Sequence, residues 1–273
     1  MDRIERQENV MKVGFIGAGN MAQAMIGGML KKQLLAREDV IASSATQATA
    51  DKVAAAFGIK TTLDNKEVAK ADIVILAIKP IFCEQVIREI RDVVTKEQLI
   101  VTIVAGKSLT WLQDAFDKDV KLIRTMPNTP ALVGEGITAL CPGEMVSQEE
   151  IDRICTLFEG FGKAQIVPER LMDAVVAVSG SSPAYVFMFI EAMADAAVAE
   201  GMPRAQAYQF AAQSVLGSAK MVLETGKHPG ELKDMVCSPA GTTIAGVCKL
   251  EETGFRSSVM ECMKACAEKS RNL

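Results

Sequence analysis

The sequence predicts an α/β domain built around a mostly parallel sheet, followed by an all-helical domain. From residue 12 to about 167, short β-branched runs alternate with helical stretches, which is the pattern of βαβ units. One run, IVILAI, is apolar on both faces, as expected of a strand covered by helices on both sides. After Pro168 these runs stop, and Ala, Met, Leu, Glu and Lys dominate. We therefore expect a first domain over 11–167 and a second over 168–273.

Individual elements follow from the same patterns. Buried strands are expected at residues 12–16, 40–43, 72–78, 99–104 and 120–125, and helices at 21–32, 46–57, 81–93 and 109–116. In the second domain the clusters SGSSP, EGMP, HPG, SPAGTT and ETGF break the chain into helices. The helix from residue 183 to about 200 is apolar around much of its circumference. This is more than one packing neighbour requires, so we expect it to be buried in a subunit interface.

Composition narrows the class of protein. The chain has 273 residues and a formal net charge of -4, which gives no electrostatic attraction to nucleic acid or an anionic membrane. Acidic residues break its most apolar helical region, so we expect no membrane span. The charged start MDRIERQENV does not resemble a secretory signal, and Met11 is a plausible functional start. We expect a cytoplasmic protein with a small-molecule partner.

The cysteine and histidine content argues against a disulfide framework or a zinc site. Seven cysteines occur without a C-x-x-C pair, which indicates reduced thiols. The single histidine, His228, lies in a predicted turn between helices, where we expect it to cap a helix rather than to act in catalysis. We therefore expect no metal site.

A glycine-rich turn follows the first expected strand and opens a helix, in the sequence VGFIGAGNMAQAM. Gly17 permits the tight turn, Gly19 lets the backbone approach a pyrophosphate, and Ala22 keeps the helix close to the sheet. The helix N-terminus supplies free N–H donors. A glycine-rich turn that binds nothing is the alternative, but the order of strand, turn and helix favours a dinucleotide. This indicates a Rossmann-type domain and most simply an oxidoreductase.

The end of the second expected strand bears on which dinucleotide is bound. NAD-specific domains usually place a carboxylate there, whereas this chain has Ser43 and Ser44, followed by Thr46. Hydroxyl groups can donate to a 2'-phosphate that a carboxylate would repel, so we expect NADPH, with NADH possible. Surface serines without a ligand are the alternative interpretation.

Two more segments lie at carboxyl ends of expected strands, where open α/β sheets bind ligands. They are Ala77-Ile78-Lys79-Pro80 and Val104-Ala105-Gly106, and their small residues leave room for the nicotinamide ribose. Lys79 is the charged side chain in the first segment. A solvated lysine at a strand end is the competing explanation for it.

Two Ser-Pro breaks in the helical domain stand at expected helix starts. In the segment 179–183, Ser182 before Pro183 fits an N-cap followed by proline at the first helical position. In the segment 238–243, SPAGTT, backbone N–H groups at the start of the next helix suit a carboxylate, and Thr243 adds a hydroxyl. Taken alone, simple capping explains either segment.

Together the motifs carry a family resemblance. GFIGAGNM, AIKP, RTMPNTP, DAVVAVSGSSPAY and HPGELKDMVCSPAGTTIAGVCKLEETGFR strongly resemble the pyrroline-5-carboxylate reductase family, from Met11 to the end of the chain. The resemblance implies NAD(P)H-dependent reduction of 1-pyrroline-5-carboxylate to L-proline, the final step of proline biosynthesis. It also implies a homodimer that assembles further, as in a decamer.

The resemblance also implies site residues. Thr243 is the catalytic candidate, which would hydrogen-bond the substrate and relay a proton. The substrate-binding residues implied are Glu169, Ser181, Ser238, Gly241, Thr242 and Thr243. The cofactor-binding residues expected from the motifs and the resemblance are Ile16, Gly17, Ala18, Gly19, Asn20, Met21, Ser43, Ser44, Asn65, Ala77, Ile78, Lys79, Pro80, Ala105 and Gly106.

The chain departs from the family pattern at three positions. It has Ser182 and Ala240 where the family often has glycine, and Val176 where threonine is common. Alanine takes positive φ less readily than glycine, which leaves the geometry of the substrate turn open.

Two other functions remain as alternatives. One is a hydroxyacid dehydrogenase, which would use a lysine or histidine for proton transfer; the SPAGTT motif argues against it. The other is a non-catalytic dinucleotide sensor or scaffold, in which the apolar helices would serve assembly alone. A protonated imine is already electrophilic, so its reduction requires alignment more than a histidine base.

Overall fold

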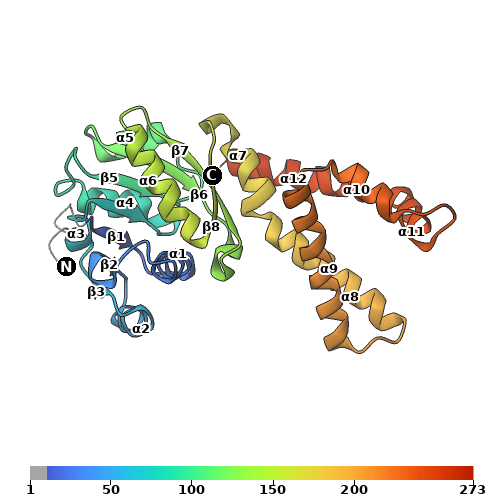
Figure 1. Cartoon of the computed structure of the whole chain (residues 1–273). Helices are drawn as coiled ribbons and strands as arrows, with labels where there is room; N and C mark the ends of the chain where they lie inside the picture. The colour runs from blue at the N-terminus through green and yellow to red at the C-terminus, as the bar shows by residue number, and fades with distance from the viewer. Residues whose placement is uncertain (1–10, 273) are drawn as a thin grey trace, which may run out of the picture. The chain divides into compact units, whose positions relative to one another are not determined.

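The computed structural model describes residues 11–272, which form two compact units (Figure 1). The first unit extends to Gly180 and also includes the end of the chain from Ala267. The second unit comprises Ser181–Cys266. The expectations about the segment before Met11 lie outside the described residues.

The first unit contains an 8-stranded sheet in the order β3-β2-β1-β4-β5-β6-β7-β8. The strands are β1 (Val13–Ile16), β2 (Val40–Ser43), β3 (Lys60–Thr62), β4 (Ile73–Leu76), β5 (Leu99–Thr102), β6 (Lys121–Met126), β7 (Gly136–Pro142) and β8 (Gly162–Ile166). Strands β1 to β6 pair in parallel, β7 is antiparallel to β6, and β8 is parallel to β7. The five strands expected from the sequence are present. The prediction did not identify β3, β7 and β8; β3 has only three residues, and β3 and β8 bury little.

Helices cover both faces of the sheet (Figure 1). They are α1 (Asn20–Lys31), α2 (Gln47–Phe57), α3 (Asn65–Val68), α4 (Pro80–Ile90), α5 (Leu109–Phe116) and α6 (Gln148–Phe158). Side chains of α1, α2 and α6 share one hydrophobic core with Ile73 and Ile75 of β4. Side chains of α4 and α5 share the other core with Val74 and Leu76. Consecutive residues of β4 thus enter opposite cores, which confirms that this strand is buried on both faces.

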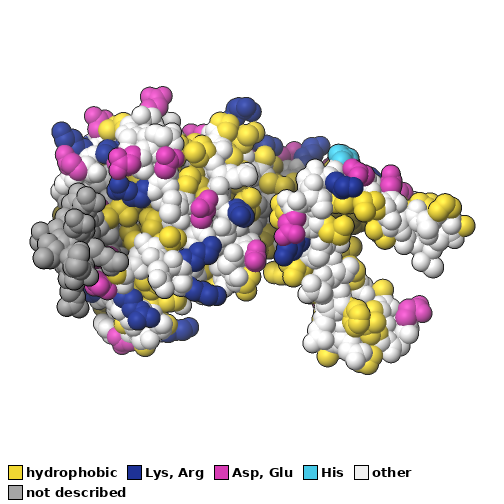
Figure 2. Space-filling model, in the orientation of Figure 1, with side chains coloured by type: hydrophobic (Ala, Val, Ile, Leu, Met, Phe, Trp, Pro, Cys, Tyr) yellow, Lys and Arg dark blue, Asp and Glu magenta, His cyan; other side chains and the backbone are white. Residues whose placement is uncertain are grey.

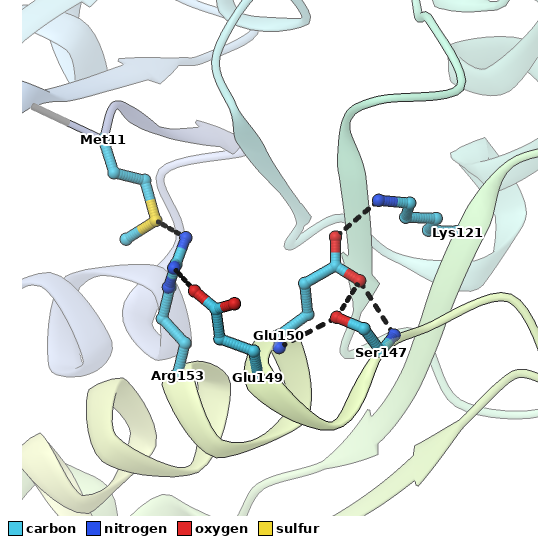
Figure 3. A network of polar contacts seen from close by, with 6 residues as sticks. All are labelled: Met11, Lys121, Ser147, Glu149, Glu150 and Arg153. Carbon is cyan, nitrogen blue, oxygen red and sulfur yellow. Dashed lines mark hydrogen bonds and ion pairs between the residues drawn. The ribbon is translucent and has the colours of Figure 1, made fainter. Parts of the chain in front are cut away.

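Polar contacts anchor α6 to the sheet (Figure 3). The helix begins with a capping box in which Ser147 and Glu150 satisfy each other's backbone N–H groups. Glu150 also pairs with Lys121 of β6 at 2.6 Å. On the same helix, Arg153 pairs with Glu149 at 2.7 Å and contacts the sulfur of Met11. The start of α6 is therefore fixed by charge as well as by its apolar face.

The first unit continues beyond the boundary expected at residue 167. The 3-10 turn Glu169–Leu171, α7 (Met172–Val175) and the π-helix Val176–Gly180 follow β8. Met172 is fully buried in a small core with Met126 and Cys141, and Asn128 donates a 3.1 Å hydrogen bond to the carbonyl of Ser179. These contacts hold the start of the helical segment against the sheet.

The second unit consists of helices, as the sequence predicts. They are α8 (Ser182–Ala199), α9 (Arg204–Thr225), α10 (Pro229–Val236), α11 (Thr242–Glu252) and most of α12 (Phe255–Arg271). The expectation that Ser182 caps α8 is wrong. The N-cap position falls on Ser181, without a side-chain hydrogen bond and in helical conformation, because the π-helix runs directly into α8.

Large apolar side chains remain on the surface of the second unit (Figure 2). They include Phe187, Met188, Phe210, Leu223 and Met260. The continuous helical segment Glu169–Ala199 is also long and apolar enough to cross a membrane, judged by length and composition. This differs from the sequence expectation of no membrane span. The acidic residues of the segment are too few to lower its mean hydropathy below that of a membrane span.

Candidate functional site

The turn after β1 has the geometry that the sequence predicts. Gly17 has a φ of 98°, and a Cβ atom there would lie 2.4 Å from the carbonyl oxygen of Ala77, so only glycine fits. Gly19 is the N-cap residue of α1 and makes no side-chain cap. A Cβ added at Gly19 would meet no atom within 4 Å, so the backbone faces open space. Gln23 holds the turn by donating a 2.8 Å hydrogen bond to the carbonyl of Ala18.

This turn fits the pyrophosphate of a dinucleotide. The strand order reverses between β1 and β4, and open α/β sheets bind ligands at the carboxyl edge where that happens. Backbone N–H groups at the start of α1, at Asn20 and Met21, lack an intrahelical partner. A helix N-terminus of this kind binds anions through its N–H groups and its dipole.

Residues after β4 and β5 extend the same edge. Ala77 donates its N–H to the carbonyl of Ile16 at 2.8 Å, which brings the end of β4 beside the glycine turn. Lys79 is exposed at the N-cap of α4, directly before Pro80. Ala105 and Gly106 follow β5 and are partly buried, and Gly106 has a φ of 75°. All these expected cofactor residues lie after neighbouring parallel strands.

The two serines at the end of β2 differ in burial and in their hydrogen-bond partners. Ser43 is fully buried, and its hydroxyl donates a 2.7 Å hydrogen bond to Oδ1 of Asn65. Asn65 in turn donates to Glu89 at 3.0 Å. Ser44 is partly exposed, and its hydroxyl donates to the carbonyl of Thr46 at 2.8 Å. Ser43 and Asn65 therefore form an internal support, and Ser44 is the serine at the surface.

In the second unit, the segment 238–243 forms a tight turn into α11. The N–H of Gly241 donates to the carbonyl of Ser238 at 3.0 Å, and Ala240 has a φ of 57°. With proline at the second position, this is a type II turn, whose third residue favours glycine. A Cβ at Gly241 would lie 2.4 Å from Oγ of Ser238, so a larger residue there would displace that hydroxyl.

The same turn leaves the start of α11 open. Gly241 is the N-cap residue and caps no N–H group with a side chain. Thr242 is exposed and Thr243 partly buried in the first helical turn. The structure thus places Ser238, Gly241 and both threonines around one helix N-terminus, which suits a carboxylate.

The remaining expected substrate residues have protein partners. Ser181 in the second unit accepts a 3.2 Å hydrogen bond from the thiol of Cys266. Glu169 belongs to the first unit, where it pairs with Arg124 and accepts from the N–H of Leu109. His228 is confirmed as a cap: its Nδ1 accepts from the N–H of Gly230 at 3.0 Å at the start of α10.

Sequence reasoning assigned no role to Arg124, Gln23 or Asn128. Arg124 lies within the strand KLIRTM and is 6% exposed, and a charge inside an otherwise apolar strand is the signal that could have drawn attention to it. Asn128 belongs to RTMPNTP and is also buried. Gln23 carries no signal, since a glutamine in the first turn of a helix is ordinary.

The fold and the glycine turn define a dinucleotide-binding oxidoreductase with a helical second domain. Residues 12–106 match the family model "NADP oxidoreductase coenzyme F420-dependent", and residues 169–273 match "Pyrroline-5-carboxylate reductase dimerisation". The chain is 52% identical over 267 residues to the pyrroline-5-carboxylate reductase of Escherichia coli K12, covering 96% of this chain and 98% of that one. The chain belongs to the pyrroline-5-carboxylate reductase family.

Further relatives agree with this assignment. The pyrroline-5-carboxylate reductase of Methanosarcina acetivorans is 44% identical, with 96% of this chain and 97% of that one covered. The solved pyrroline-5-carboxylate reductase of Coxiella burnetii superposes with a TM-score of 0.90 at 30% identity, covering 97% and 98% of the two chains. The Plasmodium falciparum structure with NADP bound has a TM-score of 0.86 at 30% identity, covering 96% and 97%.

Proposed function

We propose that this protein reduces 1-pyrroline-5-carboxylate to L-proline with NADPH, the final step of proline biosynthesis. The observation that carries the proposal is the turn 238–241, after which the first backbone N–H groups of α11 have no side-chain cap. The same chain has the glycine turn that suits a dinucleotide. Relatives that share nearly the whole chain carry the reductase name.

On the cofactor side, the open backbone at Gly19 and the free N–H groups of Asn20 and Met21 would hold the pyrophosphate. Ile16, Gly17 and Ala18 shape this turn. Bound NADPH supplies a hydride to the carbon of the protonated imine. The segments at residues 77–80 and 105–106 lie at the same sheet edge and would line the nicotinamide ribose.

Ser44 and Asn65 are proposed to lie on the adenosine side of the cofactor. Ser44 is partly exposed, whereas Ser43 acts on the site through Asn65. The preference for NADPH rests on the absence of a carboxylate at residues 43–44 and on the NADP bound to the P. falciparum relative. NADH remains a second possible donor.

On the substrate side, backbone N–H groups of Thr242 and Thr243 would hold the carboxylate, with Ser238 and Gly241 shaping the turn. Thr243 would hydrogen-bond the ring nitrogen and relay a proton to it. Glu169 and Ser181 are proposed to contact the substrate as well. These residues orient a reactive imine, and orientation alone contributes much of the rate.

The exposed apolar helices of the second unit support a homodimer. The family model for residues 169–273 describes dimerisation, and side chains such as Phe210 and Leu223 need a covering surface. We propose assembly of dimers into a decamer, in the cytoplasm, without membrane or nucleic-acid partners. The apolar segment Glu169–Ala199 would then face protein rather than lipid.

The test follows the loss of NADPH absorbance in the purified enzyme with 1-pyrroline-5-carboxylate. Wild type should oxidise NADPH, whereas Thr243→Ala should lower kcat/KM by about 10-fold or more and Thr243→Ser should retain most of it. Hydroxyacids offered with NADP should give no turnover, which separates this function from a hydroxyacid dehydrogenase. Absence of turnover in wild type would leave a sensor or scaffold as the better explanation.

A further inference from the structure

The carboxylate of Glu169 is held through one of its two oxygens. Its Oε1 accepts a 2.9 Å hydrogen bond from Nη1 of Arg124 and a 2.7 Å hydrogen bond from the backbone N–H of Leu109, the first residue of α5. Within residues 11–272, Oε2 accepts no hydrogen bond, and the side chain keeps 34% of its surface exposed. One oxygen is therefore fixed while the other is available to a ligand.

Burying the guanidinium of Arg124 in this strand is unfavourable in free energy. Its side chain is 8% exposed, and its buried Nε has no hydrogen-bond partner in the described part of the chain. Removing a guanidinium from water carries a large desolvation cost, and an apolar side chain of similar length would avoid it. Stability alone therefore gives no reason for an arginine here, and an unsatisfied buried donor calls for another explanation.

The neighbouring strands provide no other anion for this arginine. In the sheet, Arg124 lies between Thr102 of β5 and Cys141 of β7. Burial, and then the Glu169 carboxylate, raise the pKa of the Cys141 thiol, which keeps that thiol protonated at neutral pH. Glu169 is thus the anion with which Arg124 pairs.

The pair lies at the ligand-binding edge of the sheet. Arg124 is in register with Thr102, the last residue of β5, and the chain continues from Thr102 to Ala105 and Gly106. Leu109, which also holds Glu169, begins the next helix. The three residues therefore tie a carboxylate to the same carboxyl edge that carries the dinucleotide turn.

We infer that Arg124 is a positioning residue that fixes the carboxylate of Glu169 for the substrate. The inference rests on the proposed function, in which Glu169 contacts 1-pyrroline-5-carboxylate. Arg124 and the N–H of Leu109 together restrain Oε1 from two directions, which orders Oε2 before a ligand arrives. A restrained acceptor loses less conformational entropy on binding than a mobile one. Because Arg124 acts through Glu169, its removal should affect the substrate and leave the cofactor unaffected.

The experiment compares the steady-state kinetics of the full-length enzyme and five variants. Arg124→Met and Glu169→Gln should each raise the KM for 1-pyrroline-5-carboxylate by about 10-fold or more, since each removes a charge-assisted hydrogen bond. The KM for NADPH should change by less than about 2-fold, because neither residue is expected to contact the cofactor. The double variant should be no worse than Glu169→Gln alone, since the two residues act as a unit.

A matched control lies on the same strand. Lys121 pairs with Glu150 at 2.6 Å, and both side chains are largely buried. Lys121→Met removes an ion pair from β6 without touching Glu169, so it should leave the substrate KM of the folded enzyme unchanged. Arg124→Lys retains the charge but loses the planar fork, and it should recover part of the lost affinity.

Each outcome decides a different point. An inactive wild type would overturn the proposed function itself. An active wild type with an unaffected Glu169→Gln, or an Arg124→Met that lowers only the melting temperature, would overturn the inference. Losses that add in the double variant would do the same, since they would show independent effects. If Arg124→Met does not fold, Glu169→Gln still decides, because an unchanged substrate KM in that variant contradicts the role.

Discussion

The hydroxyl of Ser43 donates a 2.7 Å hydrogen bond to Oδ1 of Asn65, which leaves Ser44 as the serine at the surface of this loop. A second hydrogen bond from Asn65 to Glu89 of α4 extends the support to a neighbouring helix. The end of β2 is therefore fixed by hydrogen bonds on its buried side. Its chemistry toward a nucleotide depends on the residue at position 44 rather than on both serines.

Ser44→Asp should convert the cofactor preference. A carboxylate at this position repels a 2'-phosphate and accepts from a ribose hydroxyl, so kcat/KM with NADPH should fall by about 10-fold or more relative to NADH. Steady-state kinetics with both cofactors give the ratio. Ser44→Asn has nearly the same size without the charge and is the control. An unchanged ratio in Ser44→Asp would place the 2'-phosphate elsewhere.

Ala240→Gly should stabilise the protein. Ala240 has a φ of 57°, in the left-handed region where a Cβ is unfavourable, and glycine removes that strain. The gain is partly offset by the greater freedom of glycine in the unfolded chain, which leaves about 0.5–1 kcal/mol. Thermal unfolding at fixed protein concentration measures it, and the substrate KM should stay within about 2-fold because the turn is already formed.

A matched alanine-to-glycine substitution should change the stability in the opposite direction. Ala245 is an exposed residue inside α11, and Ala245→Gly should destabilise the protein by roughly 1 kcal/mol. If both glycine variants lowered the melting temperature equally, the left-handed conformation of Ala240 would carry no measurable strain.

His228 should matter for stability and not for hydride transfer. Its Nδ1 caps the N–H of Gly230 at the start of α10, so His228→Ala should cost about 1 kcal/mol. His228→Asp supplies another capping oxygen and should recover most of that loss, with kcat close to wild type. A kcat that falls by 10-fold or more in His228→Asp would indicate that the imidazole takes part in the reaction.

Much of both units could be predicted because the signals are local. The run IVILAI faces two cores, as its apolar residues require, and Gly17 takes the positive φ that its position after β1 demands. The cap at His228 follows from its place before Pro229. In each case the residue and the cause of its conformation lie within a few positions of each other.

The remaining features depend on contacts between distant segments. β8 was not identified because its sequence GKAQI is polar and is ordered by pairing with β7. The N-cap expected at Ser182 was wrong because the preceding π-helix, which Asn128 holds through Ser179, delivers the chain already in helical conformation. Arg124 was given no role because its partner Glu169 lies 45 residues away along the chain.

Glu150→Gln should reveal an ion pair whose contribution to stability disappears in acid. Burial acts to raise the pKa of Glu150, but hydrogen bonds from Lys121 and Ser147 outweigh it, and the pKa lies below its ordinary value of 4.5 (Figure 3). A carboxylate with a lowered folded-state pKa contributes stability above the unfolded-state value, and that contribution is lost as the pH falls through the folded-state value. Urea unfolding at about pH 7 should therefore show a loss of about 1 kcal/mol in Glu150→Gln, whereas at about pH 3 the difference from wild type should shrink. Glu149→Gln on the same helix is the control, since Glu149 is 82% exposed and its pair with Arg153 should contribute little at either pH. A difference that persisted unchanged in acid would show that Glu150 acts through its shape in the capping box rather than through its charge.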